Sequence, residues 1–239
     1  MSSSAVFLFL PRPGRGRKEK AEERQEERAL ARLKAAIAPL ESALGDRKRG
    51  KVDAATIASL AGTVQHRSGE DPGHGARVGA YCWLIALRLG IEAERAHEIG
   101  LASQLHDLGK LAIPDAILKK PGRLTPEEWE QMKTHVTLGE AMARRLGFLP
   151  PEVLEVIRHH HERWDGGGYP DGLEGVDIPL LPRIFALADV YDALTSERPY
   201  KRAWSREEAL AELERGAGQH FDPELAQIFV EQQRGSHGG

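Results

Sequence analysis

The chain has 239 residues, of which 41% are hydrophobic and 29% charged, and its formal net charge is −3. These values indicate a soluble globular protein with one substantial domain plus an extension, and they give no basic surface for DNA or RNA. Cys82 is the only cysteine, so an internal disulfide is excluded and a cytoplasmic location is expected.

The first predicted segment is a flexible tail over residues 1–17. Its apolar run, residues 5–10, is far shorter than the roughly 20 residues of a membrane-spanning helix. Pro11, Pro13 and Gly14 follow this run and favour a turn or flexible joint. We therefore expect no membrane among the partners of the chain.

Residues 18–69 are predicted to form a helical N-terminal extension. Residues 18–38 interleave Lys, Arg and Glu with alanines, a composition that strongly favours helix. Five apolar residues are spaced alternately three and four positions apart, which is the pattern of a coiled-coil seam: Leu30, Leu33, Ile37, Leu40 and Leu44. Pro39 interrupts this stripe, which predicts either a homodimer through this helix or packing against the chain's own next domain.

The last part of the extension predicts a second helix. It starts near Asp53, a residue type favoured at helix N-caps. Ile57, Leu60 and Val64 then fall on one face of that helix, so this face is expected to be buried.

Residues 70–234 form the third predicted unit, and its pattern is helical throughout. Thr125 with Glu128, and Ser205 with Glu208, make capping boxes at helix starts. We expect helices over these ranges: Arg77–Leu89, Ala93–Leu108, Thr125–Leu146, Val153–Glu162, Pro182–Thr195, one from Ser205 and one from Pro223. The loops are placed at 113–124 and 163–180. No alternating segment is long enough for a strand, so the predicted fold class is all-α.

Histidines and carboxylates gather in this unit. His106 and Asp107 are adjacent in the string HDLGK, and the further members of the set are His74, His135, the triplet His159–His161 and Asp189. Imidazole nitrogens and carboxylate oxygens are common ligands of divalent first-row metals, and a carboxylate can bridge two ions. Two such ions can clamp the attacking and leaving oxygens of a phosphoryl centre. Because the ligands lie on different predicted helices, they can converge in the core of a bundle.

The order of the motifs is similar to that of the HD-GYP family, a branch of the HD-domain phosphohydrolases. A histidine is followed by HDLGK, a second histidine, HHERWDGGGYPDG and LADVYDALTSERPYK, and GQHFDPEL closes the series. The resemblance covers roughly residues 70–230. It implies an HD-domain helical bundle with a C-terminal GYP extension, and a catalytic domain over 70–234.

The resemblance also implies roles for individual residues. The metal ligands would be His74, His106, Asp107, His135, His160, His161 and Asp189. Lys110 would reach the scissile phosphate and act with His106 and Asp107 in catalysis. The substrate side would comprise Gly168, Tyr169, Asp192, Arg198 and Lys201, and the last two cations suit phosphate recognition.

The number of metal ions depends on Glu70. It lies four positions before His74, so a helical turn between them would put both on one side. Some members of the HD-GYP family have a glutamate there that ligates a third ion, whereas members without it hold two. The opposing interpretation is a solvated turn beside Asp71 and Pro72. Two or three divalent ions are expected, and the resemblance favours iron or manganese.

Several neighbouring residues have two interpretations. His159 cannot face the same metal as both following histidines, because successive helical residues point about 100° apart. We interpret it as an outer or surface residue. Trp129 and Trp204 are expected to pack helices together. Glu162 belongs to the signature, and holding a loop is at least as plausible for it as a chemical role.

The predicted function is a metal-dependent phosphodiesterase acting on the cyclic dinucleotide c-di-GMP, with pGpG as first product and further cleavage to GMP left open. Two alternatives remain. One is a c-di-GMP binding or protein-interaction module with little turnover. The other is a phosphodiesterase for another cyclic nucleotide.

Overall fold

The computed structural model describes residues 24, 27, 28, 31, 54–69, 71, 73–146, 149–197 and 202–235. The predicted tail, the leucine stripe of residues 30–44, Glu70, Arg198 and Lys201 lie outside these residues. The homodimer prediction therefore stays a prediction. No helix in the described ranges is long and apolar enough to span a membrane.

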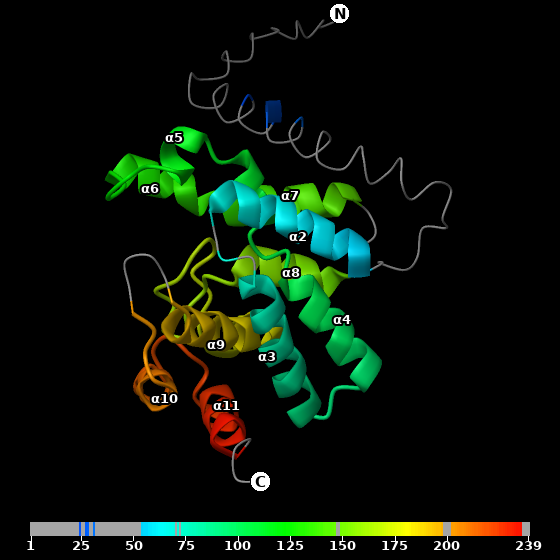
Figure 1. Ribbon diagram of the computed structural model, residues 1–239, viewed down its shortest axis with the longest axis vertical. Coiled ribbons are helices and arrows are strands. Elements are labelled where there is room, and N and C mark those ends of the chain that lie inside the picture. Colours follow the sequence, from blue (N-terminus) through cyan, green and yellow to red (C-terminus); the bar gives the residue numbers. More distant parts are fainter. Residues whose placement is uncertain are drawn as a thin grey trace, which may run out of the picture.

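Helices account for all the regular structure of the described residues, as predicted (Figure 1). In chain order the α-helices are α2 (Ala54–Ser68), α3 (His74–Arg88), α4 (Ala93–Ser103), α5 (Asp115–Leu118), α6 (Pro126–Lys133), α7 (His135–Leu146), α8 (Pro151–His159), α9 (Leu180–Thr195), α10 (Arg206–Arg215) and α11 (Pro223–Gly235). Two 3₁₀ segments accompany them: η1 (Leu108–Ala112) and η2 (Gly175–Asp177). The all-α fold class is confirmed.

Two of the predicted helices end earlier than expected, each next to a candidate ligand. The helix expected over 93–108 ends at Ser103, and a turn precedes η1. The helix expected over 125–146 is split into α6 and α7 at Thr134, whose hydroxyl donates to the carbonyl of Gln131. A side chain that bonds its own backbone competes with the helix ladder, so the helix that begins at Thr125 is shorter than predicted. Both predicted capping boxes are present.

Two apolar cores hold the helices together. The larger is built mainly by α3, α9, α10 and α11, with α9 at the centre (Figure 1). The smaller contains the predicted face of α2, with Ile57, Leu60 and Val64 all buried. Each such side chain stabilises the fold by about 1.5–3 kcal/mol. α2, which the sequence analysis assigned to the extension, thus shares a core with the turn that carries His106 and Asp107.

Paired glycines allow two close backbone approaches. A Cβ on Gly79 of α3 would strike the carbonyl oxygen of Gly100 on α4. A Cβ on Gly109 of η1 would strike the carbonyl oxygen of His135 and lie 2.6 Å from the nitrogen of Gly139 on α7. These two contacts bring η1 against α7 and α3 against α4, so that residues far apart in sequence become neighbours.

Candidate metal centre

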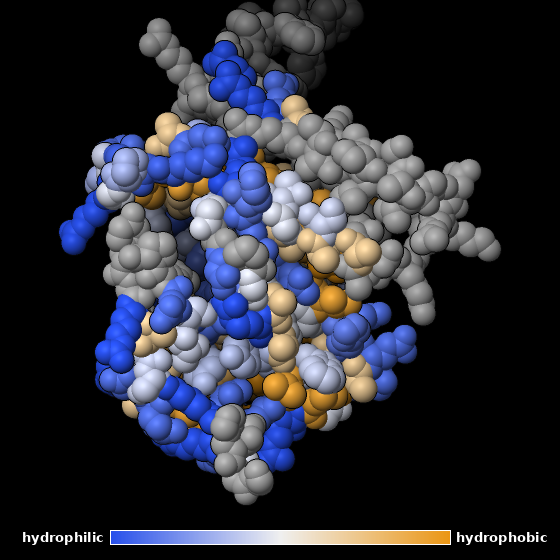
Figure 2. All heavy atoms as spheres, in the orientation of Figure 1, coloured by the Kyte–Doolittle hydropathy of each residue, from blue (hydrophilic) through white to orange (hydrophobic). Residues whose placement is uncertain are grey.

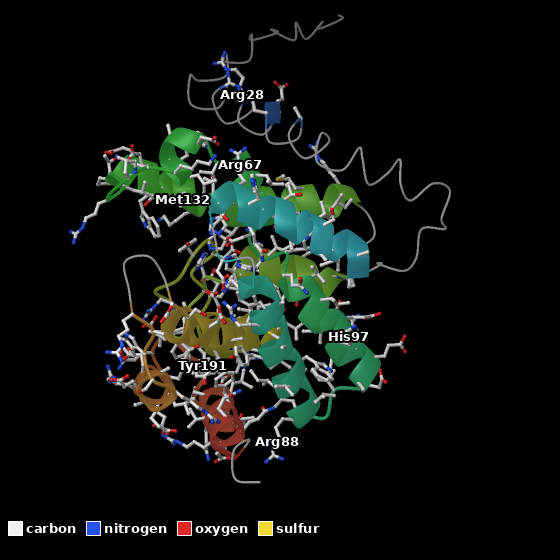
Figure 3. The ribbon with its side chains drawn as sticks, in the orientation of Figure 1. Arg28, Arg67, Arg88, His97, Met132 and Tyr191 are labelled. Carbon is white, nitrogen blue, oxygen red and sulfur yellow. The ribbon has the colours of Figure 1, made fainter. Side chains whose placement is uncertain are left out.

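The candidate ligands all sit at helix ends or on the central helix. His74 and His135 are the first residues of α3 and α7, and His160 and His161 directly follow α8. Asp189 lies within α9, and His106 and Asp107 occupy the turn between α4 and η1. The described members of the predicted ligand set are therefore brought together, and side chains crowd this region between α2 and α9 in Figure 3.

The ligand atoms form two groups. The first consists of His74, His106 and Asp189. The second consists of three histidines: His135, His160 and His161. Within each group the candidate atoms lie within 4.8 Å of one another. The Nε2 atoms of His135 and His160 are 3.4 Å apart. Two three-residue groups of this kind suit two divalent ions with nitrogen and oxygen ligands.

Hydrogen bonds fix which imidazole nitrogen faces the centre. Nδ1 of His106 lies 3.0 Å from the carbonyl oxygen of Ser103, and Nδ1 of His135 lies 2.8 Å from that of Met132. Nδ1 of His160 lies 3.1 Å from the carbonyl oxygen of Ile157. A carbonyl only accepts, so each Nδ1 carries a proton and Nε2 is the nitrogen that faces the centre. Such outer contacts orient metal-binding histidines.

Asp107 lies between the two groups. Its Oδ2 is 3.0 Å from Nε2 of His106, and its Oδ1 is 3.3 Å from Nε2 of His135. Oδ1 is buried and accepts no hydrogen bond. A buried carboxylate oxygen without a donor is costly, and a divalent cation would satisfy it. The donor set therefore fits metal binding, with Asp107 facing both groups.

The two groups differ in protonation. Burial would lower the pKa of His74 and His106, but Asp189 and Asp192 raise that of His74 to about 10 and Asp107 raises that of His106, so a metal ion would displace a proton from each. Burial lowers the pKa of His160 well below its ordinary value and, with the neighbouring His135, lowers that of His161 to about 4, so both are neutral ligands. Burial alone would raise the pKa of Asp107, but the charge of Lys110 and the contacts with His106 outweigh it. Lys110 Nζ lies 2.6 Å from Asp107 Oδ2. The pKa of Asp107 stays well below its ordinary value, so it is an anion.

Asp192 is not where the sequence predicted it. Instead of facing a substrate, it is only 1% exposed and sits behind His74. Its Oδ2 is 2.8 Å from Nδ1 of His74, and its Oδ1 accepts from Nε of Arg77 at 2.5 Å. No sequence pattern pointed to this contact of Arg77. Asp189 and Asp192 are three apart on α9, so both can face His74, and Asp192 orients it.

The loop with the sequence GYP is held by a buried glutamate. Glu162 accepts hydrogen bonds from the backbone N–H groups of Asp171, Gly172 and Leu173 at 2.8–3.1 Å. A Cβ on Gly168 would meet the carbonyl oxygen of His161 at 2.6 Å, so only glycine fits there. Of the two interpretations of Glu162, the observed contacts favour the loop-holding one.

Tyr169 lies against the second ligand group. Its ring stacks on that of His161 with centroids 4.7 Å apart and an interplanar angle of 27°. Burial raises the pKa of its hydroxyl, with Asp107 adding to the shift, so Tyr169 is neutral. Gly168 and Tyr169 are thus beside the metal ligands.

Other predictions concern residues outside the centre. His159 contacts Asp171 at 3.1 Å and takes no part in either ligand group, as expected for an outer residue. His97 is exposed on α4 and lies away from the centre in Figure 3. Trp129 is 46% exposed, more than its predicted role in helix packing requires.

These features define a class of protein: an α-helical protein with two groups of histidine and carboxylate side chains that could hold divalent metal ions. The family described as "HD domain" matches residues 56–225. The chain belongs to the HD-domain family, and its motifs are those of the HD-GYP type, so the resemblance is confirmed.

Curated relatives and solved structures agree with this assignment. A 3′3′-cGAMP-specific phosphodiesterase 2 of Vibrio cholerae is 44% identical over 73% of this chain and 34% of its own length. The cyclic di-GMP phosphodiesterase response regulator RpfG of Xanthomonas campestris is 43% identical over 73% of this chain and 47% of its own. A cyclic GMP-AMP specific phosphodiesterase structure from V. cholerae matches with a TM-score of 0.60 at 26% identity, covering 77% of this chain and 49% of that one. The chain spans about a third to a half of the length of these relatives.

Proposed function

We propose that this chain is a metal-dependent phosphodiesterase that hydrolyses c-di-GMP, with pGpG as the first product. The observation that carries the proposal is the position of Asp107, which faces two ligand groups and has Lys110 beside it. Relatives named as cyclic di-GMP phosphodiesterases at 43% identity support the substrate.

The proposed metal ligands are the histidines and carboxylates of the two groups. One ion would be held by His74, His106 and Asp189, and another by three histidines: His135, His160 and His161. Asp107 would contribute one carboxylate oxygen to each. When bound, divalent ions supply Lewis-acid stabilisation of the phosphoryl oxygens and a nucleophile at neutral pH. Asp192 keeps His74 in place through Nδ1.

Lys110 places a positive charge at the edge of the centre. Its ammonium pairs with Asp107 and carries three protons, so it can donate a hydrogen bond to a phosphate oxygen. The same group can give a proton to the departing 3′-oxygen. Tyr169, neutral and stacked on His161, closes one side of the centre.

Arg198 and Lys201 complete the proposed substrate side. A cyclic dinucleotide carries two negative phosphates, and charged hydrogen bonds to phosphate contribute about 1.5–3 kcal/mol each. Arg198→Ala and Lys201→Ala should weaken c-di-GMP binding without removing metal. Calorimetry on metal-loaded variants tests this, and unchanged affinity in both variants would refute the assignment.

For the metals, we propose iron or manganese and a third ion bound through Glu70. Plasma mass spectrometry on anaerobically purified protein should give three ions per chain, falling to two in Glu70→Ala. Two ions in both proteins would show that Glu70 is not a ligand. A loss of all metal in Glu70→Ala would point to misfolding of the turn, which circular dichroism would detect.

The decisive experiment is turnover by the metal-loaded chain. Incubation with c-di-GMP followed by chromatography should give pGpG, or GMP if cleavage continues, and Asp107→Asn should give neither while keeping its helical content. The same assay with 3′3′-cGAMP tests the second substrate class, which the relatives named 3′3′-cGAMP-specific phosphodiesterases support. Binding of c-di-GMP without any product in metal-loaded wild type would support a binding module instead.

A further inference from the structure

Three aromatic rings lie in series from the metal centre outward. His161 belongs to the second ligand group, and Tyr169 stacks on it at 4.7 Å. Trp129 meets the ring of Tyr169 edge to face, with centroids 6.3 Å apart and planes at 79°. The series therefore runs from a partly buried candidate ligand to an exposed tryptophan. A nucleotide bound with its phosphate at the metal centre would place its sugar and then its base along the same outward direction.

Trp129 is exposed, although it lies on a helix, α6, whose N-terminus is fixed by side-chain hydrogen bonds. Its relative exposure is 46%, and no residue of α6 is fully buried. The start of α6 is fixed by the capping box of Thr125 and Glu128, and Glu128 also pairs with Lys120 at 2.5 Å. Helix packing would bury a tryptophan more completely. Trp129 thus keeps 46% of its surface exposed on a helix whose start is fixed.

A cation accompanies the rings on the same face of α6. Lys133 lies four residues after Trp129, and residues at this spacing are neighbours on a helix. Its Nζ is 5.7 Å from the centroid of Tyr169. Lys133 also pairs with Glu130 at 2.8 Å. Figure 2 shows a mostly hydrophilic surface over α5 and α6.

We infer that Trp129, with Tyr169 and Lys133, forms a platform for one purine base of the cyclic dinucleotide. This inference rests on the proposed function, because it names a base-binding part of the same site. An exposed aromatic face stacks on any nucleobase, so the platform contributes affinity with little selection between guanine and adenine. Lys133 adds positive charge near the bound nucleotide.

The test compares Trp129→Ala and Trp129→Phe with Trp83→Ala, which removes a tryptophan of similar exposure (38%) from α3. Loss of one stacked base should raise KM for c-di-GMP by about fivefold to a hundredfold in Trp129→Ala. The value of kcat should change much less, since Trp129 touches no ligand of the metal centre. Trp129→Phe should recover part of the loss, and Trp83→Ala should behave as wild type. Metal content and melting temperature identify any misfolded variant.

Binding gives a second measurement that does not depend on turnover. A hydrolysis-resistant phosphorothioate analogue of c-di-GMP should quench tryptophan fluorescence in the metal-loaded wild type and in Trp83→Phe, and much less in Trp129→Phe. Equal KM in wild type and Trp129→Ala, or equal quenching in Trp129→Phe, would overturn the platform. Absence of product from wild type would instead count against the proposed function, while the quenching result would still decide the platform.

Discussion

Gly109 is the residue whose replacement tests the construction of the site most directly. It is the glycine of HDLGK, and its Cα faces the start of α7. A Cβ there would collide with the carbonyl oxygen of His135 and lie 2.6 Å from the nitrogen of Gly139. Both neighbours are backbone atoms, so neither can swing away as a side chain could. The φ of Gly109 is not positive, so the cost of Gly109→Ala is steric.

The magnitude follows from overpacking. Forcing a methyl group into a filled backbone contact costs about 1–3 kcal/mol, and this exceeds the gain of roughly 0.4–1 kcal/mol from a less flexible unfolded chain. We expect Gly109→Ala to lower the free energy of unfolding by about 1–2 kcal/mol. Because α7 begins with His135, the displacement should also weaken the second ligand group and lower metal content.

The assay is urea unfolding together with metal analysis. Gly62→Ala is the matched control, since Gly62 lies inside α2 with nothing within 4 Å of an added Cβ. That variant should gain up to about 1 kcal/mol from helix propensity and keep its metal. Wild-type stability and metal content in Gly109→Ala would refute the close-packing argument.

Two further predictions concern residues that hold others in place. Glu162→Ala should lower the free energy of unfolding by about 2 kcal/mol or more, because three backbone N–H groups of the loop lose their acceptor; urea unfolding measures this, and faster proteolysis within 163–175 should accompany it. Asp192→Asn should weaken metal affinity about 10- to 100-fold by releasing His74. Competition with a chelator measures that loss, and an unchanged affinity would mean that Asp192 does not orient the ligand.

The sequence predicted the elements well wherever local chemistry decides them. The capping boxes at Thr125 and Ser205, and the buried stripe of α2, are local patterns that the structure retains. Helix ends were predicted less well. The break at Thr134 coincides with the bond from its hydroxyl to Gln131 and with the packing of η1 against α7, and the helical periodicity of the sequence carries neither contact.

The same distinction applies to the site. Residue type and motif order were enough to select candidate ligands, because imidazole nitrogens and carboxylate oxygens are common ligands of divalent metals, and the structure places six of these candidates in two groups. Asp192 was misplaced because a carboxylate near the centre can serve a substrate, a metal or another side chain, and only the bonds to His74 and Arg77 decide among these. Trp129 was assigned to packing because exposure is a tertiary property that a sequence does not carry.

The placement of the histidines explains why the motif spacing is so uneven. His74, His135 and His160 stand at helix ends, and Nδ1 of the latter two contacts a carbonyl oxygen of the preceding segment. A helix end leaves such carbonyls without an intrahelical partner. Each of these two histidines therefore bonds a carbonyl at a helix end through one nitrogen and turns the other toward the candidate metal centre. These histidines only need to lie at helix ends that meet at the centre, so the loops between them can differ in length.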